Sequence, residues 1–205
     1  MNLYSISLFV HMIGLIALFG GFVILQLAGA RMRGATTWQV ARTWLELLRL
    51  APSMLIAGTL FMLASGLVMT RVQWTFMTPW VLVAMVVAVM FVVLGVLVVG
   101  RSLTRIARTS RESEGPISGE ARTLLAAPVL WSTVLGMNGA ALGVVWLMTT
   151  KPGWAGSIGI PLVLTVLGSF IGLALARSRR SQATERRGTP PITSRPLAHG
   201  GSGRH

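Results

Sequence analysis

The sequence contains no cysteine, no aspartate and few charged residues of any kind. Without cysteine, disulfide bonds, thiolate metal sites, iron–sulfur clusters and cysteine nucleophiles are excluded. Charged residues make up 11% of the chain, whereas about a quarter is usual in a soluble domain. All five acidic residues are glutamates outside the apolar runs. Paired acids, a Ser-His-Asp triad and a carboxylate proton relay are therefore unsupported, and we expect no enzyme.

Long apolar runs fill the chain instead, since 53% of its 205 residues are hydrophobic. A helix needs roughly 20 predominantly apolar residues to cross the hydrocarbon core, because unpaired backbone groups in lipid are costly. Five stretches meet this requirement. The sequence therefore predicts an all-α integral membrane bundle of five transmembrane helices. The predicted spans are 6–27, 52–69, 79–99, 128–148 and 158–176.

The basic residues alternate between the two sides of these spans. The first and third connections carry four and five arginines, whereas the second and fourth carry one basic residue each, Arg71 and Lys151. Because cytoplasmic segments retain lysine and arginine, the pattern predicts an outside N-terminus and a cytoplasmic C-terminus in a bacterial cytoplasmic membrane. The arginines are expected to meet anionic lipid headgroups. A nucleic-acid partner is not expected, because the net charge of +13 lies between apolar runs instead of on one folded face.

Two segments outside the spans have their own character. In residues 37–50, Trp38, Ala41, Leu45 and Leu48 recur at helical spacing. This pattern predicts an amphipathic helix lying on the inner leaflet, with its arginines near the headgroups. We take residues 1–176 as the transmembrane domain. Residues 177–205 are rich in Arg, Ser, Thr, Gly and Pro, which predicts a disordered basic tail.

His11 is the one ionisable side chain well inside a predicted span, about 8 Å from its outer end at 1.5 Å per residue. Ionisable groups in membranes face the protein interior and often mark ligand or cofactor sites. The competing interpretation is a neutral imidazole hydrogen-bonded to another helix. As a functional residue, His11 is a candidate axial ligand of haem b or a ligand of copper.

Methionine is the partner that such a site would need. No second histidine lies in a predicted span, so six-coordinate haem would require a methionine, and Met62, Met69 and Met85 are the candidates in the predicted outer half. Five-coordinate haem would need His11 alone. The eleven methionines also permit soft coordination of Cu(I), although packing is the commoner role of this residue.

Other residues in the spans suggest packing. Asn138 lies near the middle of the fourth span, where its amide is expected to form an interhelical hydrogen bond, with a polar pathway or a place beside His11 as the alternative. Small residues four apart permit close helix contact within the bundle or, alternatively, in a homo-oligomer. They occur as Gly139 with Gly143 and as Gly168 with Gly172.

Several short motifs are distributed along the chain. They are Leu3-Tyr4-Ser5, Leu8-Phe9-Val10-His11, Gly14, Phe19, the stretch 44–52, Ser65-Gly66-Leu67, Leu147-Met148 and Lys151-Pro152. With these motifs the chain resembles the bacterial integral membrane family called domain of unknown function 2269. The resemblance covers roughly residues 1–176 and implies a small helical bundle without an established activity. More distantly, a first-helix histidine followed by glycines is similar to copper-resistance D-like membrane proteins and to haem-binding protoporphyrinogen oxidase relatives; only His11 carries over.

Three functional hypotheses follow from these observations. The first is a non-enzymatic accessory or partner-binding membrane protein, because no reactive constellation is present. The second is a haem- or copper-binding membrane protein that uses His11. Transport of a small solute is the third, and it is disfavoured by the lack of buried carboxylates.

Overall fold

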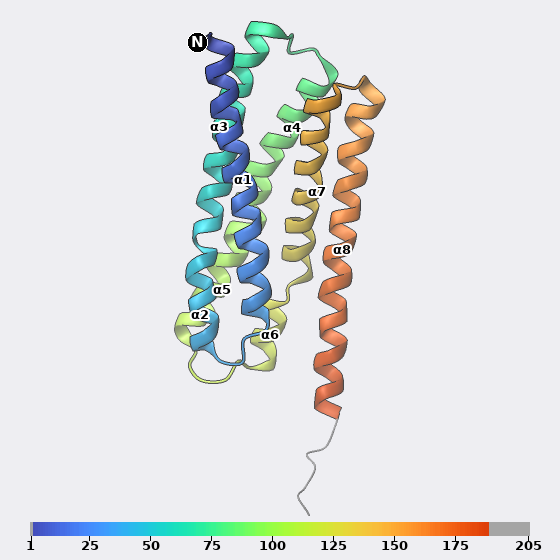
Figure 1. Cartoon of the computed structure of the whole chain (residues 1–205). Helices are drawn as coiled ribbons and strands as arrows, with labels where there is room; N and C mark the ends of the chain where they lie inside the picture. Colours follow the sequence, from blue (N-terminus) through green and yellow to red (C-terminus); the bar gives the residue numbers. More distant parts are fainter. Residues whose placement is uncertain (1, 189–205) are drawn as a thin grey trace, which may run out of the picture.

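The computed structural model describes residues 2–188, with side chains through residue 177. The regular elements of this part of the chain are all helices (Figure 1). Five helical segments are long and apolar enough to cross a membrane, as many as the sequence predicted, and the predicted all-α fold is confirmed. These segments are Leu3–Arg33, Trp38–Gln73, Pro79–Glu112, Gly119–Thr150 and Trp154–Arg177.

Three of the long helices begin at residues suited to that position. The Asn2 side chain accepts a hydrogen bond from the Ser5 amide at the first turn, and Pro79 and Pro128 begin two helices where a missing N–H costs nothing. The elements are α1 (Leu3–Arg33), α2 (Trp38–Leu48), α3 (Leu50–Gln73), α4 (Pro79–Leu94), the π-helix η1 (Gly95–Gly100), α5 (Arg101–Glu112), α6 (Gly119–Leu125), α7 (Pro128–Thr150) and α8 (Trp154–Gly188).

The two ends of the bundle differ in the connections and short helices that lie there. The N-terminus, the α3–α4 connection and the α7–α8 connection lie at one end, which we call the N-terminal end (Figure 1). The short helices α2 and α6, together with α5, lie at the opposite end, which we call the basic end. The arginine-rich first and third connections therefore share one end, in agreement with the alternation of basic residues in the sequence.

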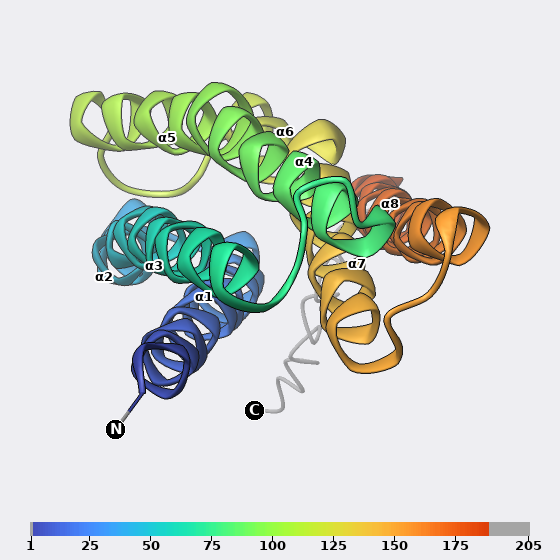
Figure 2. The same cartoon turned by 90° about the horizontal axis from the view of Figure 1, so that it is seen from above.

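Two tightly packed helix pairs form the frame of the bundle. Seen from above, α1 lies against α3 and α7 against α8, with α4 between the pairs (Figure 2). The first pair meets at Gly14 and Gly58. A Cβ atom at Gly58 would lie 2.6 Å from the Leu18 nitrogen and 2.7 Å from the Gly14 carbonyl oxygen. Only the absence of side chains lets these two backbones approach so closely.

The second pair uses the glycines that the sequence singled out. A Cβ atom at Gly139 would collide with the Leu164 carbonyl, and one at Gly168 would collide with the Leu135 carbonyl. Gly143 lies against Pro161 of α8, and Gly172 lies against α7 at Ser132. The predicted close contact is therefore confirmed within one chain, between α7 and α8.

The position of α2 corrects one prediction. Its apolar face, Trp38, Ala41, Leu45 and Leu48, is at most 6% exposed and belongs to the protein core. Only one residue separates α2 from α3, so the helix is held against α1 and α5 and cannot spread on a leaflet. The helix is amphipathic as predicted, but its apolar partner is protein.

Arg42 of α2 also contacts protein, although the arginines of this segment were predicted to lie near lipid headgroups. Its guanidinium donates to the Ser110 carbonyl at 2.7 and 3.0 Å and to the Ser113 carbonyl at 2.6 Å. These carbonyls lie at the C-terminal end of α5, where the helix leaves its acceptors unpaired. Arg42 therefore fastens α2 to α5, and a role at lipid headgroups is not needed to explain it.

The last helix is longer than the sequence indicated. The disordered tail was predicted from residue 177, but α8 continues to Gly188 before the described part of the chain ends. A transmembrane helix supplies the nucleus for such an extension, because propagation is far easier than initiation. The remainder of the predicted tail, 189–205, lies outside the described residues.

Gly58→Ala is expected to destabilise the fold, because the added methyl group meets backbone atoms of α1 that cannot rotate away. Overpacking of this kind costs about 1–3 kcal/mol. Gly159→Ala is the matched control, since a Cβ atom there has nothing within 4 Å. Unfolding of both variants in detergent, followed by circular dichroism against SDS, tests the difference. Equal stability of the two would contradict the close approach of α1 and α3.

Candidate functional site

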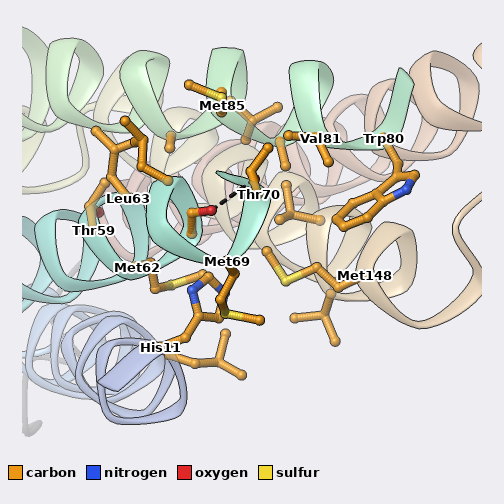
Figure 3. Close-up of a pocket in the computed structure, with 18 of the residues that line it drawn as sticks. His11, Thr59, Met62, Leu63, Met69, Thr70, Trp80, Val81, Met85 and Met148 are labelled. Carbon is orange, nitrogen blue, oxygen red and sulfur yellow. Dashed lines mark hydrogen bonds between the residues drawn. The ribbon is translucent and has the colours of Figure 1, made fainter. Parts of the chain in front are cut away.

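A cavity opens in the half of the bundle toward the N-terminal end. It has a volume of about 350 Å³, which is within the range of small-molecule sites, and its lining comes from α1, α3, α4 and α7 (Figure 3). The cluster of buried apolar side chains begins at Leu18 of α1 and continues toward the basic end. The cavity therefore borders this core, and Leu18, Phe91 and Ala141 belong to both.

His11 of α1 lies in the cavity wall and is 7% exposed. Its position follows from the close approach at Gly14, less than one helical turn away, which brings the ring against α3. There the Nδ1 atom lies 3.0 Å from the Ser65 Oγ atom. The predicted hydrogen bond to another helix is thus present, and the same residue faces a cavity.

The hydrogen bonds of Ser65 assign the tautomer of His11. The Ser65 hydroxyl donates to carbonyls of its own helix, Phe61 at 2.5 Å and Met62 at 3.2 Å. A hydroxyl has one proton, so toward His11 it acts as the acceptor, and Nδ1 carries the ring proton. The neutral ring then keeps a lone pair on Nε2. Histidines that bind metals have this arrangement, with one nitrogen donating to a protein acceptor and the other left for the ligand.

Methionines gather around the same cavity. Five of the eleven methionines of the chain line it: Met12, Met62, Met69, Met85 and Met148. In Figure 3 the His11 ring lies beside Met62 and Met69, while Met85 approaches from α4 and Met148 from α7. The three methionines proposed from the sequence as axial partners, Met62, Met69 and Met85, therefore share one cavity with His11.

The described residues contain no group of three or more His, Cys, Asp or Glu side chains that could hold a metal ion. Any metal bound here would depend on His11 and on thioether sulfurs, which are soft ligands. The remaining walls are largely aliphatic and aromatic, among them Leu63, Val81 and Phe91. Such walls suit a ligand with a large apolar body.

The mouth of the cavity is aromatic and cationic. Trp74 and Trp80 stack edge to face with ring centroids 5.3 Å apart, and the Lys151 ammonium lies 4.6 Å from the centroid of Trp74. All three residues line the cavity. From the sequence, Lys151 was used only for topology and as part of the Lys151-Pro152 motif, and Trp74 and Trp80 were given no functional role. One signal that could have distinguished Lys151 is that it is the single lysine of the chain.

Asn138 is not part of this site. Its amide donates to the Val134 carbonyl of its own helix at 2.9 Å, so the predicted interhelical hydrogen bond is wrong. The carbonyl four residues back is always within reach of a short polar side chain, and bonding to it satisfies the amide without a second helix. The residue does not line the cavity, and it is not brought beside His11.

Comparison with known proteins gives no family: no protein-family model, no curated protein and no solved structure matches this chain.

The assigned tautomer predicts a specific NMR spectrum. In a His199→Gln, His205→Gln background, ¹⁵N-histidine labelling leaves His11 as the single signal. We expect a protonated Nδ1 and an unprotonated Nε2, because Ser65 accepts from the ring. Ser65→Ala should weaken this preference and shift the ring toward a mixture of tautomers, because only the Met62 backbone then remains as an acceptor for the ring. A spectrum with the proton on Nε2 in the unchanged cavity would contradict the assignment.

Proposed function

We propose that this chain is a non-enzymatic, multi-pass protein of a bacterial cytoplasmic membrane that holds haem b in the cavity beside His11. The N-terminus faces outward and the C-terminus the cytoplasm, so the cavity lies in the outer half of the bilayer. The observation that carries the proposal is the His11–Ser65 pair, which leaves Nε2 with a lone pair in the wall of an apolar cavity.

The apolar composition of the cavity favours haem over a bare ion. A Cu(I) site is a compact set of soft ligands, whereas this cavity has a volume of about 350 Å³ and walls from four helices. Aliphatic and aromatic walls suit a flat apolar macrocycle. Bound haem supplies one-electron chemistry whose potential depends on its axial ligands and on burial.

The residues of the chain have distinct roles in this proposal. His11 would hold the haem iron through Nε2, and Ser65 orients the ring by accepting a hydrogen bond from Nδ1–H. Met62, Met69 and Met85 would supply either a thioether ligand or polarisable packing around the macrocycle. A protein of this kind fits an accessory subunit of a membrane complex.

Haem binding can be tested with the purified protein in detergent. Titration with haemin is expected to give a shifted Soret band at one equivalent, because Nε2 coordinates the iron. His11→Ala should abolish the shift. His199→Ala is the matched control, since it removes a histidine from outside the spans.

The competing outcome is metal binding without haem. If the protein ignores haemin but retains one equivalent of Cu(I), lost in His11→Ala and in Met69→Ala, the cavity holds copper and the haem proposal fails. If neither is retained, the His11–Ser65 pair is a helix-packing contact and the accessory role stands without a cofactor.

The proposed orientation has its own test. A fluorescent protein that folds only in the cytoplasm, fused after His205, should be bright, because the basic end and the tail retain their arginines on the inside. An alkaline phosphatase fusion at the same site should be inactive. The reverse pair of results would invert the topology and move the cavity to the inner half.

A further inference from the structure

Lys151 is the single lysine of the chain, and it stands at the N-terminal end without an acidic neighbour. The described part of the chain has one salt bridge, between Arg108 and Glu112, and it lies on α5 at the basic end. Glu46 and Glu120 lie on α2 and α6 of that end, and Glu114 lies in the connection between α5 and α6. Among the side chains that the structure describes, Lys151 is thus a cation at the cavity mouth with no carboxylate to neutralise it.

Local structure holds this cation in place. Lys151 ends α7 in the left-handed conformation, with φ 49° and ψ 54°, which few residues other than glycine adopt. Its ammonium lies over the Trp74 ring at 4.6 Å, and Trp74 is braced by Trp80. A cation–π contact keeps the side chain at the cavity and leaves its N–H groups able to donate.

Two threonine hydroxyls near the mouth do not compete with Lys151 as donors. Thr70 donates to the Gly66 carbonyl at 2.8 Å, and Thr149 donates to the Trp146 carbonyl at 2.8 Å. Both protons are therefore used within their own helices. An anionic oxygen that enters the mouth finds its charged donor in the Lys151 ammonium.

We infer that the cavity takes an amphipathic carboxylate, with its apolar body beside His11 and its carboxylate paired with Lys151 under the Trp74–Trp80 platform. The inference rests on the proposed function and makes it specific, since haem is a macrocycle with propionate groups. Lys151 acts as a specificity residue: it selects ligands that carry an acid at one end. It touches the carboxylate and not the iron.

This inference can be tested by comparing porphyrins that carry free carboxylates with their dimethyl esters. Haemin, iron-free protoporphyrin IX and the dimethyl esters of both are titrated into the protein in detergent, with Soret absorbance and tryptophan quenching as readouts. In Lys151→Met, affinity for the free acids should fall roughly tenfold, as expected for loss of one charge-assisted hydrogen bond. Affinity for the esters should stay the same, because Met keeps the apolar stem.

Two further variants complete the design. Lys151→Arg should restore binding of the free acids, and Arg71→Met, which removes the other cation of this end outside the cavity lining, should change nothing. If Lys151→Met binds acids and esters as the unchanged protein does, the inference is overturned. Equal losses for acids and esters would also overturn it, because they would mark a general packing defect.

The iron-free porphyrin separates this inference from the proposed function. It cannot bind Nε2 through a metal, so its dependence on Lys151 is independent of axial ligation. If Lys151→Met weakens the iron-free acid while His11→Ala leaves the haemin spectrum unchanged, the anion site stands and haem ligation falls. If none of the four porphyrins binds, both are wrong.

Discussion

The hydrogen bond between His11 and Ser65 joins α1 to α3 where the two helices otherwise meet through glycine and apolar side chains. In hydrocarbon a polar group must find a protein partner, and most of the described polar side chains in the spans use a carbonyl of their own helix. Thr59, Thr70, Asn138 and Thr165 all do so. His11 cannot, because its ring reaches past its own helix, and so it fixes which faces of α1 and α3 meet.

This contact divides the molecule into two halves of different character. Below it, the apolar side chains of α1, α3 and α7 pack with the short helices of the basic end into one continuous core. Arg33 strengthens this end by lying 3.9 Å from the Trp131 ring centroid, and Arg42 ties α2 to α5. Around it and toward the N-terminal end, the helices surround a cavity.

Sequence reasoning identified the features that depend on periodicity and on solvent. Five spans, the alternation of basic ends, the α7–α8 glycine contact and His11 all follow from the cost of polar groups in lipid and from helical geometry. Sequence reasoning was wrong where one side chain or helix face had two possible packing or hydrogen-bonding partners. The apolar face of α2 suits protein as well as lipid, and Asn138 can bond within its helix or across to another. A sequence alone does not rank such partners, because the choice depends on which helices are neighbours.

The cavity could not be predicted from the sequence, because it is the space that remains where neighbouring helices do not pack closely. α1 with α3 and α7 with α8 approach closely because glycines face each other at their crossings. The sequence of α4 from Pro79 to Leu94 contains no glycine and is dominated by valine, so this helix cannot approach the two pairs as closely. Space therefore remains where α4 meets α1, α3 and α7, and methionine, the most adaptable apolar side chain, lines it. The cavity therefore forms beside α4, which lacks glycine. The close packing of α1 against α3 at their glycines places His11 in the cavity wall.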